Sequence, residues 1–114
     1  MVEYVPQRGE VVWLEFEPQK GKEIKKRRPA LVVSPQTYNL KTGLALFMPI
    51  TSQIKGYPFE CLIESPDIKG VILCDQMRSL DWKARKALYI TKISPETWEE
   101  VVAKFSTLIE SSTY

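Results

Sequence analysis

Short apolar runs separated by turns that contain proline or glycine occupy most of this sequence, and they limit the folds that it can adopt. The runs predict β-strands at residues 10–17, 29–34, 44–50, 59–63, 71–74 and 87–91. The connections between them are too short for parallel crossovers, so we expect an antiparallel order. The sequence therefore predicts a mainly β fold, built as a small, curled antiparallel sheet or barrel.

The individual runs predict different environments. Residues 10–17 alternate apolar and polar side chains, which is typical of a half-buried strand, whereas residues 29–34 are almost wholly apolar and predict a central strand. We expect residues 35–41 to form a connection with one short helical turn. Residues 51–57 predict a loop in which Gly56 is the permissive position. Residues 75–84 are ambiguous, and one interpretation is a short turn followed by chain that crosses the sheet.

A C-terminal helix is the clearest single element. Ser94 and Pro95 are typical of an N-cap followed by the first helical position. The apolar residues that follow have helical spacing: Trp98, Val101, Val102, Phe105, Leu108 and Ile109. We expect an amphipathic helix whose apolar stripe covers one face of the sheet, which makes the fold class α+β.

Composition narrows the function classes. With 114 residues, we expect a single domain at 1–114, and the N-terminus does not resemble a signal peptide. No apolar stretch approaches the length of a membrane helix, so we expect a cytoplasmic protein that does not contact a membrane. The two cysteines, Cys61 and Cys74, predict buried reduced thiols. The chain has no histidine, which excludes the usual histidine-containing zinc sites and histidine-dependent ribonucleases. We expect no metal and no cofactor.

Charge is concentrated in one segment. The net charge is only +2, yet residues 20–28 hold six basic residues and one acidic residue, Glu23. This segment is either a solvated loop or a phosphate-binding loop. It ends in Arg28-Pro29, directly before a predicted buried strand. An arginine fixed at its base in this way suits a phosphate, which a guanidinium grips with two parallel hydrogen bonds.

Two further loops carry polar groups at strand ends. Residues 51–53, Thr51-Ser52-Gln53, offer two hydroxyls and an amide, or else form a turn that caps its own backbone. After the strand at 71–74, Gln76 has the groups to read a base edge, and Asp75 to accept hydrogen bonds or brace Arg78.

These groups suit RNA, which carries its own nucleophile in the 2′-hydroxyl. The enzyme must then align the strand and stabilise charge on the phosphate, and an arginine with a hydroxyl donor can do so. Arginine is a poor base because it stays protonated. Glu23 is a weak candidate for the base, because the neighbouring cations lower rather than raise the pKa of its carboxyl.

An ordered set of motifs resembles the MazF family, the toxin endoribonucleases of bacterial toxin–antitoxin pairs. The matching stretches are Arg8-Gly9-Glu10-Val11-Val12-Trp13, Phe16-Glu17-Pro18, Arg28-Pro29-Ala30-Leu31-Val32-Val33-Ser34-Pro35, Tyr38-Asn39, Lys41-Thr42-Gly43, Pro49-Ile50-Thr51-Ser52-Gln53, Lys55-Gly56-Tyr57-Pro58-Phe59-Glu60, Gly70-Val71, Asp75-Gln76 and Ala84-Arg85.

The resemblance implies an SH3-like barrel of the kind shared by MazF- and CcdB-type toxins, and an active homodimer. It implies metal-independent cleavage of single-stranded RNA to a 2′,3′-cyclic phosphate and a free 5′-hydroxyl. The implied catalytic pair is Arg28 and Thr51, with Glu23 at an acidic position linked to activity. The residues expected to contact RNA are Lys55, Gln76, Ser52, Gln53, Arg85 and Asn39. The implied partner is an antitoxin whose acidic, disordered tail occupies the RNA groove, as a mimic of the phosphate backbone.

Two departures from the family pattern limit what is carried over. Residues 24–27, Ile24-Lys25-Lys26-Arg27, replace the usual glycine or small polar residues and make the groove more basic. Leu73 stands where one branch of the family has a catalytic arginine, so the mechanism of that branch is not carried over.

Two alternative functions remain open from the sequence. A gyrase poison of the same fold depends on a C-terminal Trp-Gly-Ile, and this chain ends in Ser112-Thr113-Tyr114 instead. A module that only binds nucleic acid or antitoxin would not need both Arg28 and Thr51.

Overall fold

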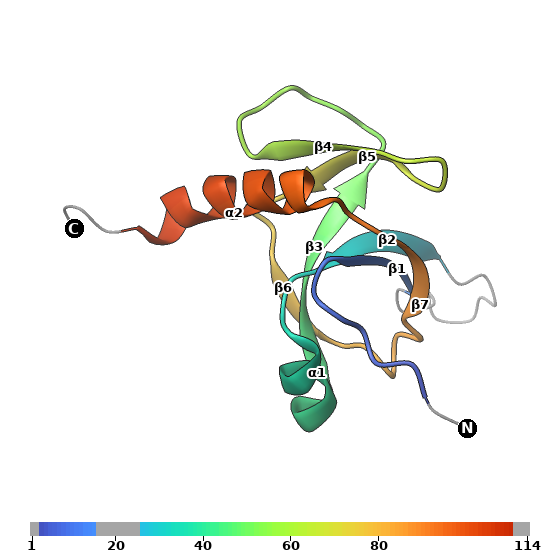
Figure 1. The fold of residues 1–114 in the computed structure, drawn as a ribbon. Helices are drawn as coiled ribbons and strands as arrows, with labels where there is room; N and C mark the ends of the chain where they lie inside the picture. Colours follow the sequence, from blue (N-terminus) through green and yellow to red (C-terminus); the bar gives the residue numbers. More distant parts are fainter. Residues whose placement is uncertain (1–2, 16–25, 111–114) are drawn as a thin grey trace.

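A curled antiparallel sheet forms the body of the molecule (Figure 1). The computed structural model describes residues 3–15 and 26–110. The strands are β1 (Glu10–Glu15), β2 (Arg27–Val32), β3 (Leu44–Thr51), β4 (Glu60–Glu64), β5 (Lys69–Leu73), β6 (Arg78–Asp81) and β7 (Leu88–Lys92). They run in the order β4-β5-β3-β2-β1-β7, with β6 also paired to β3, and each pairing is antiparallel. The predicted antiparallel sheet is confirmed, and β2 is central as expected.

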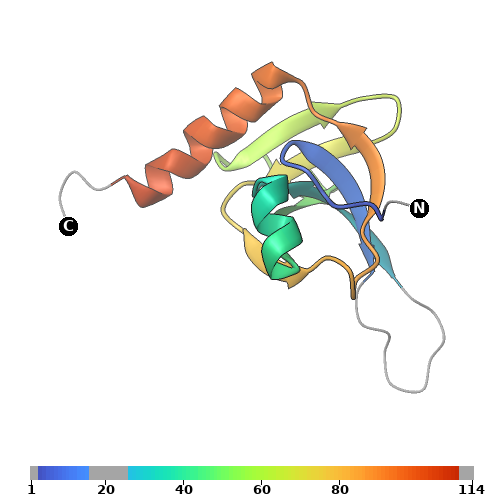
Figure 2. The same ribbon diagram turned by 60° about the horizontal axis from the view of Figure 1, so that its bottom comes forward.

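Two helices complete the described part of the chain. Helix α1 (Gln36–Thr42) packs on β3, and helix α2 (Pro95–Ile109) packs on β4 (Figures 1 and 2). The N-cap of α2 is as predicted, because the Ser94 side chain accepts a hydrogen bond from the Thr97 N–H. Neither helix in residues 3–15 and 26–110 has the length and apolar character needed to cross a bilayer.

Four elements differ from the prediction, one of which is β5, which begins at Lys69 and not at residue 71. Helix α1 has seven residues instead of one short turn, and Gly43 ends it in the left-handed conformation. Strand β2 begins two residues before Pro29. Strand β6 lies in the segment that the sequence left ambiguous, because its sequence Arg-Ser-Leu-Asp has no apolar alternation. Its pairing with residues 44–47 of β3 creates the strand, and a local pattern cannot report such a long-range contact.

Apolar side chains cover both faces of the central strands. One cluster, which includes Val11, Leu31, Met48 and Ile72, packs against Val101 on α2. The other cluster is made of Val12, Leu14, Ala30, Val32, Ala45, Phe47 and Trp82. Burial on both faces explains why residues 29–34 read as a continuous apolar run.

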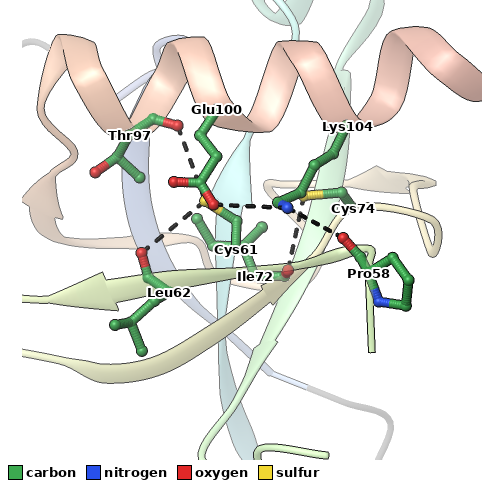
Figure 3. A network of polar contacts seen from close by, with 8 residues as sticks. All are labelled: Pro58, Cys61, Leu62, Ile72, Cys74, Thr97, Glu100 and Lys104. Carbon is green, nitrogen blue, oxygen red and sulfur yellow. Dashed lines mark hydrogen bonds and ion pairs between the residues drawn. The ribbon is translucent and has the colours of Figure 1, made fainter. Parts of the chain in front are cut away.

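The two cysteines lie under α2 beside a small polar network (Figure 3). Cys61 and Cys74 are both fully buried free thiols, as predicted. Burial raises the pKa of Cys61 to about 12 and that of Cys74 to about 11, so both remain protonated at neutral pH. Next to them, the Lys104 ammonium forms an ion pair with Glu100 (3.7 Å) and donates a hydrogen bond to the Pro58 carbonyl (3.1 Å). Lys104 thus joins α2 to the loop that follows β3.

Asn39 is buried inside the fold, which contradicts the expectation that it contacts RNA. Its side chain is 0% exposed and donates hydrogen bonds to the carbonyls of Pro6 (2.8 Å) and Ser34 (3.1 Å). The side-chain oxygen of Asn39 accepts a hydrogen bond from the Ser34 hydroxyl, and its main-chain carbonyl accepts one from the Trp82 indole N–H (2.9 Å). A side chain without accessible surface cannot touch RNA, so Asn39 is removed from the expected RNA contacts.

Replacing Asn39 with alanine is expected to lower the free energy of unfolding by about 1–3 kcal/mol, because buried carbonyls and a hydroxyl lose their partner. Urea denaturation followed by circular dichroism measures this change. Thr37→Ala, at an exposed position of the same helix, is the matched control and should change stability by about 0.5 kcal/mol or less. An unchanged denaturation midpoint in Asn39→Ala would contradict the structural role.

Candidate active site

A polar hollow of about 390 Å³ opens where β2 begins and β3 and β5 end. Most of its polar side chains come from positions that the sequence singled out. It is lined by Arg28, Pro49, Ile50, Thr51, Gln53, Lys55, Tyr57, Glu60, Leu73, Gln76 and Arg78.

Strand register brings Arg28 and Thr51 together. The ladder between β2 and β3 pairs Ala30 with Pro49, Leu31 with Met48 and Val32 with Phe47. The ladder ends at the Ala30–Pro49 pair; Arg28 lies two residues before Ala30 and Thr51 two residues after Pro49, and both line the hollow. Arg28 is exposed and Thr51 half-buried, so both side chains are accessible at the hollow. The two residues are far apart in the sequence but adjacent at the ends of neighbouring strands.

The Thr51 hydroxyl is oriented by its own turn. Its Oγ1 accepts a hydrogen bond from the Gln53 N–H at 3.1 Å. The capping turn that the sequence offered as an alternative therefore exists, and it does not exclude a chemical role. A hydroxyl that accepts one hydrogen bond can still donate its own hydrogen, so Thr51 can serve as a donor to an anion in the hollow.

The loop between β3 and β4 is braced from three sides. The Glu60 carboxylate accepts hydrogen bonds from the N–H groups of Lys55 (3.0 Å) and Gly56 (2.8 Å). The Tyr57 hydroxyl donates to the Asp75 carboxylate, with oxygen–oxygen distances of 3.0 and 3.2 Å. The third brace is Lys104, through Pro58. Gly56 has a φ of +85°, so it is the permissive residue of this loop, as expected.

The charge of the hollow is predominantly positive. Among the lining residues that the structure describes, Arg28, Lys55 and Arg78 face one carboxylate, Glu60, whose oxygens accept the two loop N–H groups. The hydrogen bond to Asp75 raises the pKa of the Tyr57 hydroxyl, which therefore stays protonated at neutral pH. Such a site attracts an anion and holds donors around it.

The structure brings together five of the predicted site residues: Arg28, Thr51, Gln53, Lys55 and Gln76. Ser52 lies on the other side of the Arg28–Thr51 pair, in a second hollow described below. Arg85 lies outside both linings, beside the end of β1, where it donates to the Glu15 carbonyl at 3.4 Å. Glu23 falls outside the described residues.

Sequence reasoning missed three polar lining residues, Tyr57, Glu60 and Arg78. Tyr57 and Glu60 were seen only as part of a motif, and Arg78 only as a residue for Asp75 to brace. Within residues 3–15 and 26–110, Asp75 holds Tyr57 instead of Arg78. Arg78 reaches the hollow because β6 pairs with β3, with Arg78 opposite Phe47. The described residues contain no group of three or more histidine, cysteine, aspartate or glutamate side chains that could hold a metal ion.

Comparison with known proteins gives a consistent result. Residues 7–109 match the family model of the PemK-like, MazF-like toxins of type II toxin–antitoxin systems. The chain is 44% identical over 106 residues to the endoribonuclease toxin MazF of Escherichia coli, covering 93% of this chain and 96% of the relative. It is 34% identical over 110 residues to the endoribonuclease toxin ChpB of the same organism, covering 91% and 94%. A MazE–MazF crystal structure from Deinococcus radiodurans matches with a TM-score of 0.88 and 45% identity, over 96% of this chain and all of that chain.

The curled sheet with its C-terminal helix is thus the fold of the MazF toxins. The chain belongs to the PemK-like, MazF-like toxin family of type II toxin–antitoxin systems.

Proposed function

We propose that this protein is an endoribonuclease toxin that cleaves single-stranded RNA without a metal ion, and that Arg28 and Thr51 are its catalytic residues. The observation that carries the proposal is a basic hollow at the ends of the paired strands β2 and β3 whose lining includes both the Arg28 guanidinium and the Thr51 hydroxyl. The names of the relatives support it, because MazF and ChpB of Escherichia coli are both endoribonucleases.

RNA supplies the nucleophile for this reaction. The 2′-hydroxyl attacks the adjacent phosphorus, and the bond from phosphorus to the 5′-oxygen breaks. The 2′-oxygen loses its proton and the departing 5′-oxygen gains one, which leaves a 2′,3′-cyclic phosphate and a 5′-hydroxyl. The Arg28 guanidinium neutralises the charge that builds on the phosphate oxygens, and the Thr51 hydroxyl donates a hydrogen bond to one of them. Both groups lie on strand ends and are therefore positioned before the substrate arrives.

The other lining residues bind the strand in this proposal. Lys55 and Arg78 contact phosphates, whereas the Gln53 and Gln76 amides have the donor and acceptor needed to read a base edge. Because the loop that carries Gln53 and Lys55 is braced by Glu60, these side chains project from a defined backbone.

Neither Glu60 nor Tyr57, the candidates among the described lining residues, is suited to act as the general base. Glu60 lines the hollow, but its oxygens accept two backbone N–H groups. Tyr57 is a poor candidate because its raised pKa keeps the hydroxyl protonated at neutral pH. Glu23 remains the candidate from the sequence.

We also propose an antitoxin partner and a homodimer. The solved relative from Deinococcus radiodurans is a complex of MazE with MazF. An acidic, disordered antitoxin tail would be attracted by the same cations that contact RNA phosphates, and would block the hollow. A cytoplasmic location accords with an RNA substrate and with two unpaired buried thiols, which a reducing compartment preserves.

Cleavage is expected to continue in EDTA, because the nucleophile is part of the RNA and no step requires a metal-bound water. The measurement is a digest of a long RNA of low structure by purified, antitoxin-free protein in EDTA, followed by mapping of the new 5′ ends. Discrete cuts that share a short motif and carry 5′-hydroxyl termini are the expected result.

The control for a contaminating nuclease is the same preparation of an Arg28→Ala variant. Loss of cutting that added magnesium restores would contradict the metal-free reaction. Intact RNA from a folded protein would contradict the ribonuclease proposal, and a DNA supercoiling assay would then test the gyrase alternative.

A further inference from the structure

A second hollow, of about 570 Å³, lies on the other side of the Arg28–Thr51 pair. It shares Arg28, Ile50 and Thr51 with the first hollow, so the two are continuous past the pair. Its other lining residues are Trp13, Lys26, Arg27, Pro29, Ser52, Ile68 and Lys69.

This second hollow is strongly basic. Lys26, Arg27, Arg28 and Lys69 line it, and all four are exposed. No carboxylate is found among those of its lining residues that the structure describes. The cations come from two directions, Lys26 and Arg27 at the start of β2 and Lys69 at the start of β5. A polyanion in this hollow would therefore meet positive charge on both sides.

An aromatic ring lies among these cations. Trp13 on β1 is partly exposed, and the Arg27 guanidinium lies over its ring, 5.4 Å from the centroid. This contact holds Arg27 at the hollow and leaves part of the indole accessible. Cations that track a backbone, combined with an aromatic ring on which a base can stack, are the features by which proteins hold single-stranded nucleic acid. An acidic peptide would use the cations but would gain nothing comparable from the indole.

We infer that the second hollow binds nucleotides on one flank of the cleaved bond, with a base stacked on Trp13 and phosphates bound by Arg27 and Lys69. The inference rests on the proposed ribonuclease function and extends it: substrate binding continues past the catalytic pair on one side. RNA trimmed on that flank should then lose the contribution of these residues, while RNA trimmed on the other flank should keep it.

The test uses three RNA oligonucleotides, each with a 2′-deoxy substitution that removes the nucleophile at the mapped cut. One is a 12-mer centred on the cut, and the others are trimmed to the cut on the 5′ or the 3′ side. Fluorescence anisotropy measures the affinity of each across a range of sodium chloride concentrations. The double variant Arg27→Ala/Lys69→Ala should bind the 12-mer about tenfold more weakly near 0.15 M salt, and the slope of log K against log salt should fall by about 1.4, at about 0.7 per phosphate contact.

One trimmed RNA should be bound equally by the wild-type protein and the double variant. The other should lose as much affinity in the double variant as the 12-mer does. Trp13→Leu should weaken binding of the same RNAs without changing the salt slope, because it removes stacking and not charge. The matched control is Lys41→Ala/Lys92→Ala, which removes two exposed lysines from α1 and β7 and should leave the 12-mer affinity within about twofold.

Equal losses on all three RNAs, or no loss on any, would overturn the inference while the digest still supports cleavage. A loss of affinity for a decaglutamate peptide without a loss for RNA would overturn it in favour of an acidic protein segment. If the wild-type protein neither cuts nor binds RNA, the proposed function fails, and the inference fails with it.

Discussion

RNA cleavage by an Arg28→Ala variant is expected to fall by about 10²–10³-fold in kcat, the usual cost of removing one group that stabilises the charged transition state. Arg28 is exposed and lines the hollow together with Thr51, so its loss affects the hollow and not the core. Single-turnover cleavage of a short RNA that contains the mapped site measures the effect. Arg28→Lys should recover part of the rate, because it keeps the charge but not the planar fork that matches a phosphate.

The control for Arg28→Ala is Arg8→Ala. Arg8 is also exposed, but it donates to the Val33 carbonyl and lies over the Trp98 ring, away from both hollows. Arg8→Ala should cut RNA at the wild-type rate. If Arg28→Ala cut equally well, Arg28 would not be catalytic, and the assignment of the site would be wrong.

Replacing Gly70 with alanine is expected to lower both stability and activity, although Gly70 lines neither hollow. Its φ is +147°, and a Cβ there would lie 2.3 Å from the carbonyl oxygen of Thr51 and 3.0 Å from the carbonyl carbon. Because both obstacles are backbone atoms, the end of β3 must move. We expect the free energy of unfolding to fall by about 1–3 kcal/mol. We expect cleavage to fall by about 10²-fold if Thr51 moves by about 1 Å.

Gly43→Ala separates displacement of Thr51 from simple backbone strain. Gly43 also has a positive φ, +74°, but nothing lies within 4 Å of its added Cβ, and it is the C-cap of α1. It should lose about 1–2 kcal/mol of stability through strain and cut RNA normally. Urea denaturation and single-turnover cleavage, performed where both variants are folded, make the comparison. Wild-type cleavage by Gly70→Ala would show that the position of Thr51 is not critical.

The sequence predicted those parts of the fold that local chemistry controls. Burial on both faces made residues 29–34 apolar, so β2 was recognisable as central. Ser94 and Pro95 located the start of α2 because capping depends on a few adjacent residues. Strand β6 was missed because its partner on β3 lies more than 30 residues earlier in the chain.

Prediction of the site was limited in the same way. Arg28 and the residues 51–53 were singled out because each follows or precedes a buried strand, but no local pattern predicted that Arg28 and Thr51 would line the same hollow. Asn39 was assigned to RNA binding through the family resemblance, and its position in the sequence does not show that it is buried. Its side chain is hydrogen-bonded to Pro6 and Ser34, and its main-chain carbonyl to Trp82; Pro6 and Trp82 are both distant in the sequence.

Strand β3 has a consequence for how such toxins can diverge. It pairs with β2 and β6 along its first part and with β5 at Ile50 and Thr51, so Thr51 is held by the sheet itself. Gln53 and Lys55 come after this point, on a loop whose backbone is fixed by Glu60 and Lys104. Their side chains can therefore be exchanged without moving Thr51. A descendant of this chain could acquire a different set of RNA targets through a few surface substitutions and retain the same bond-breaking chemistry.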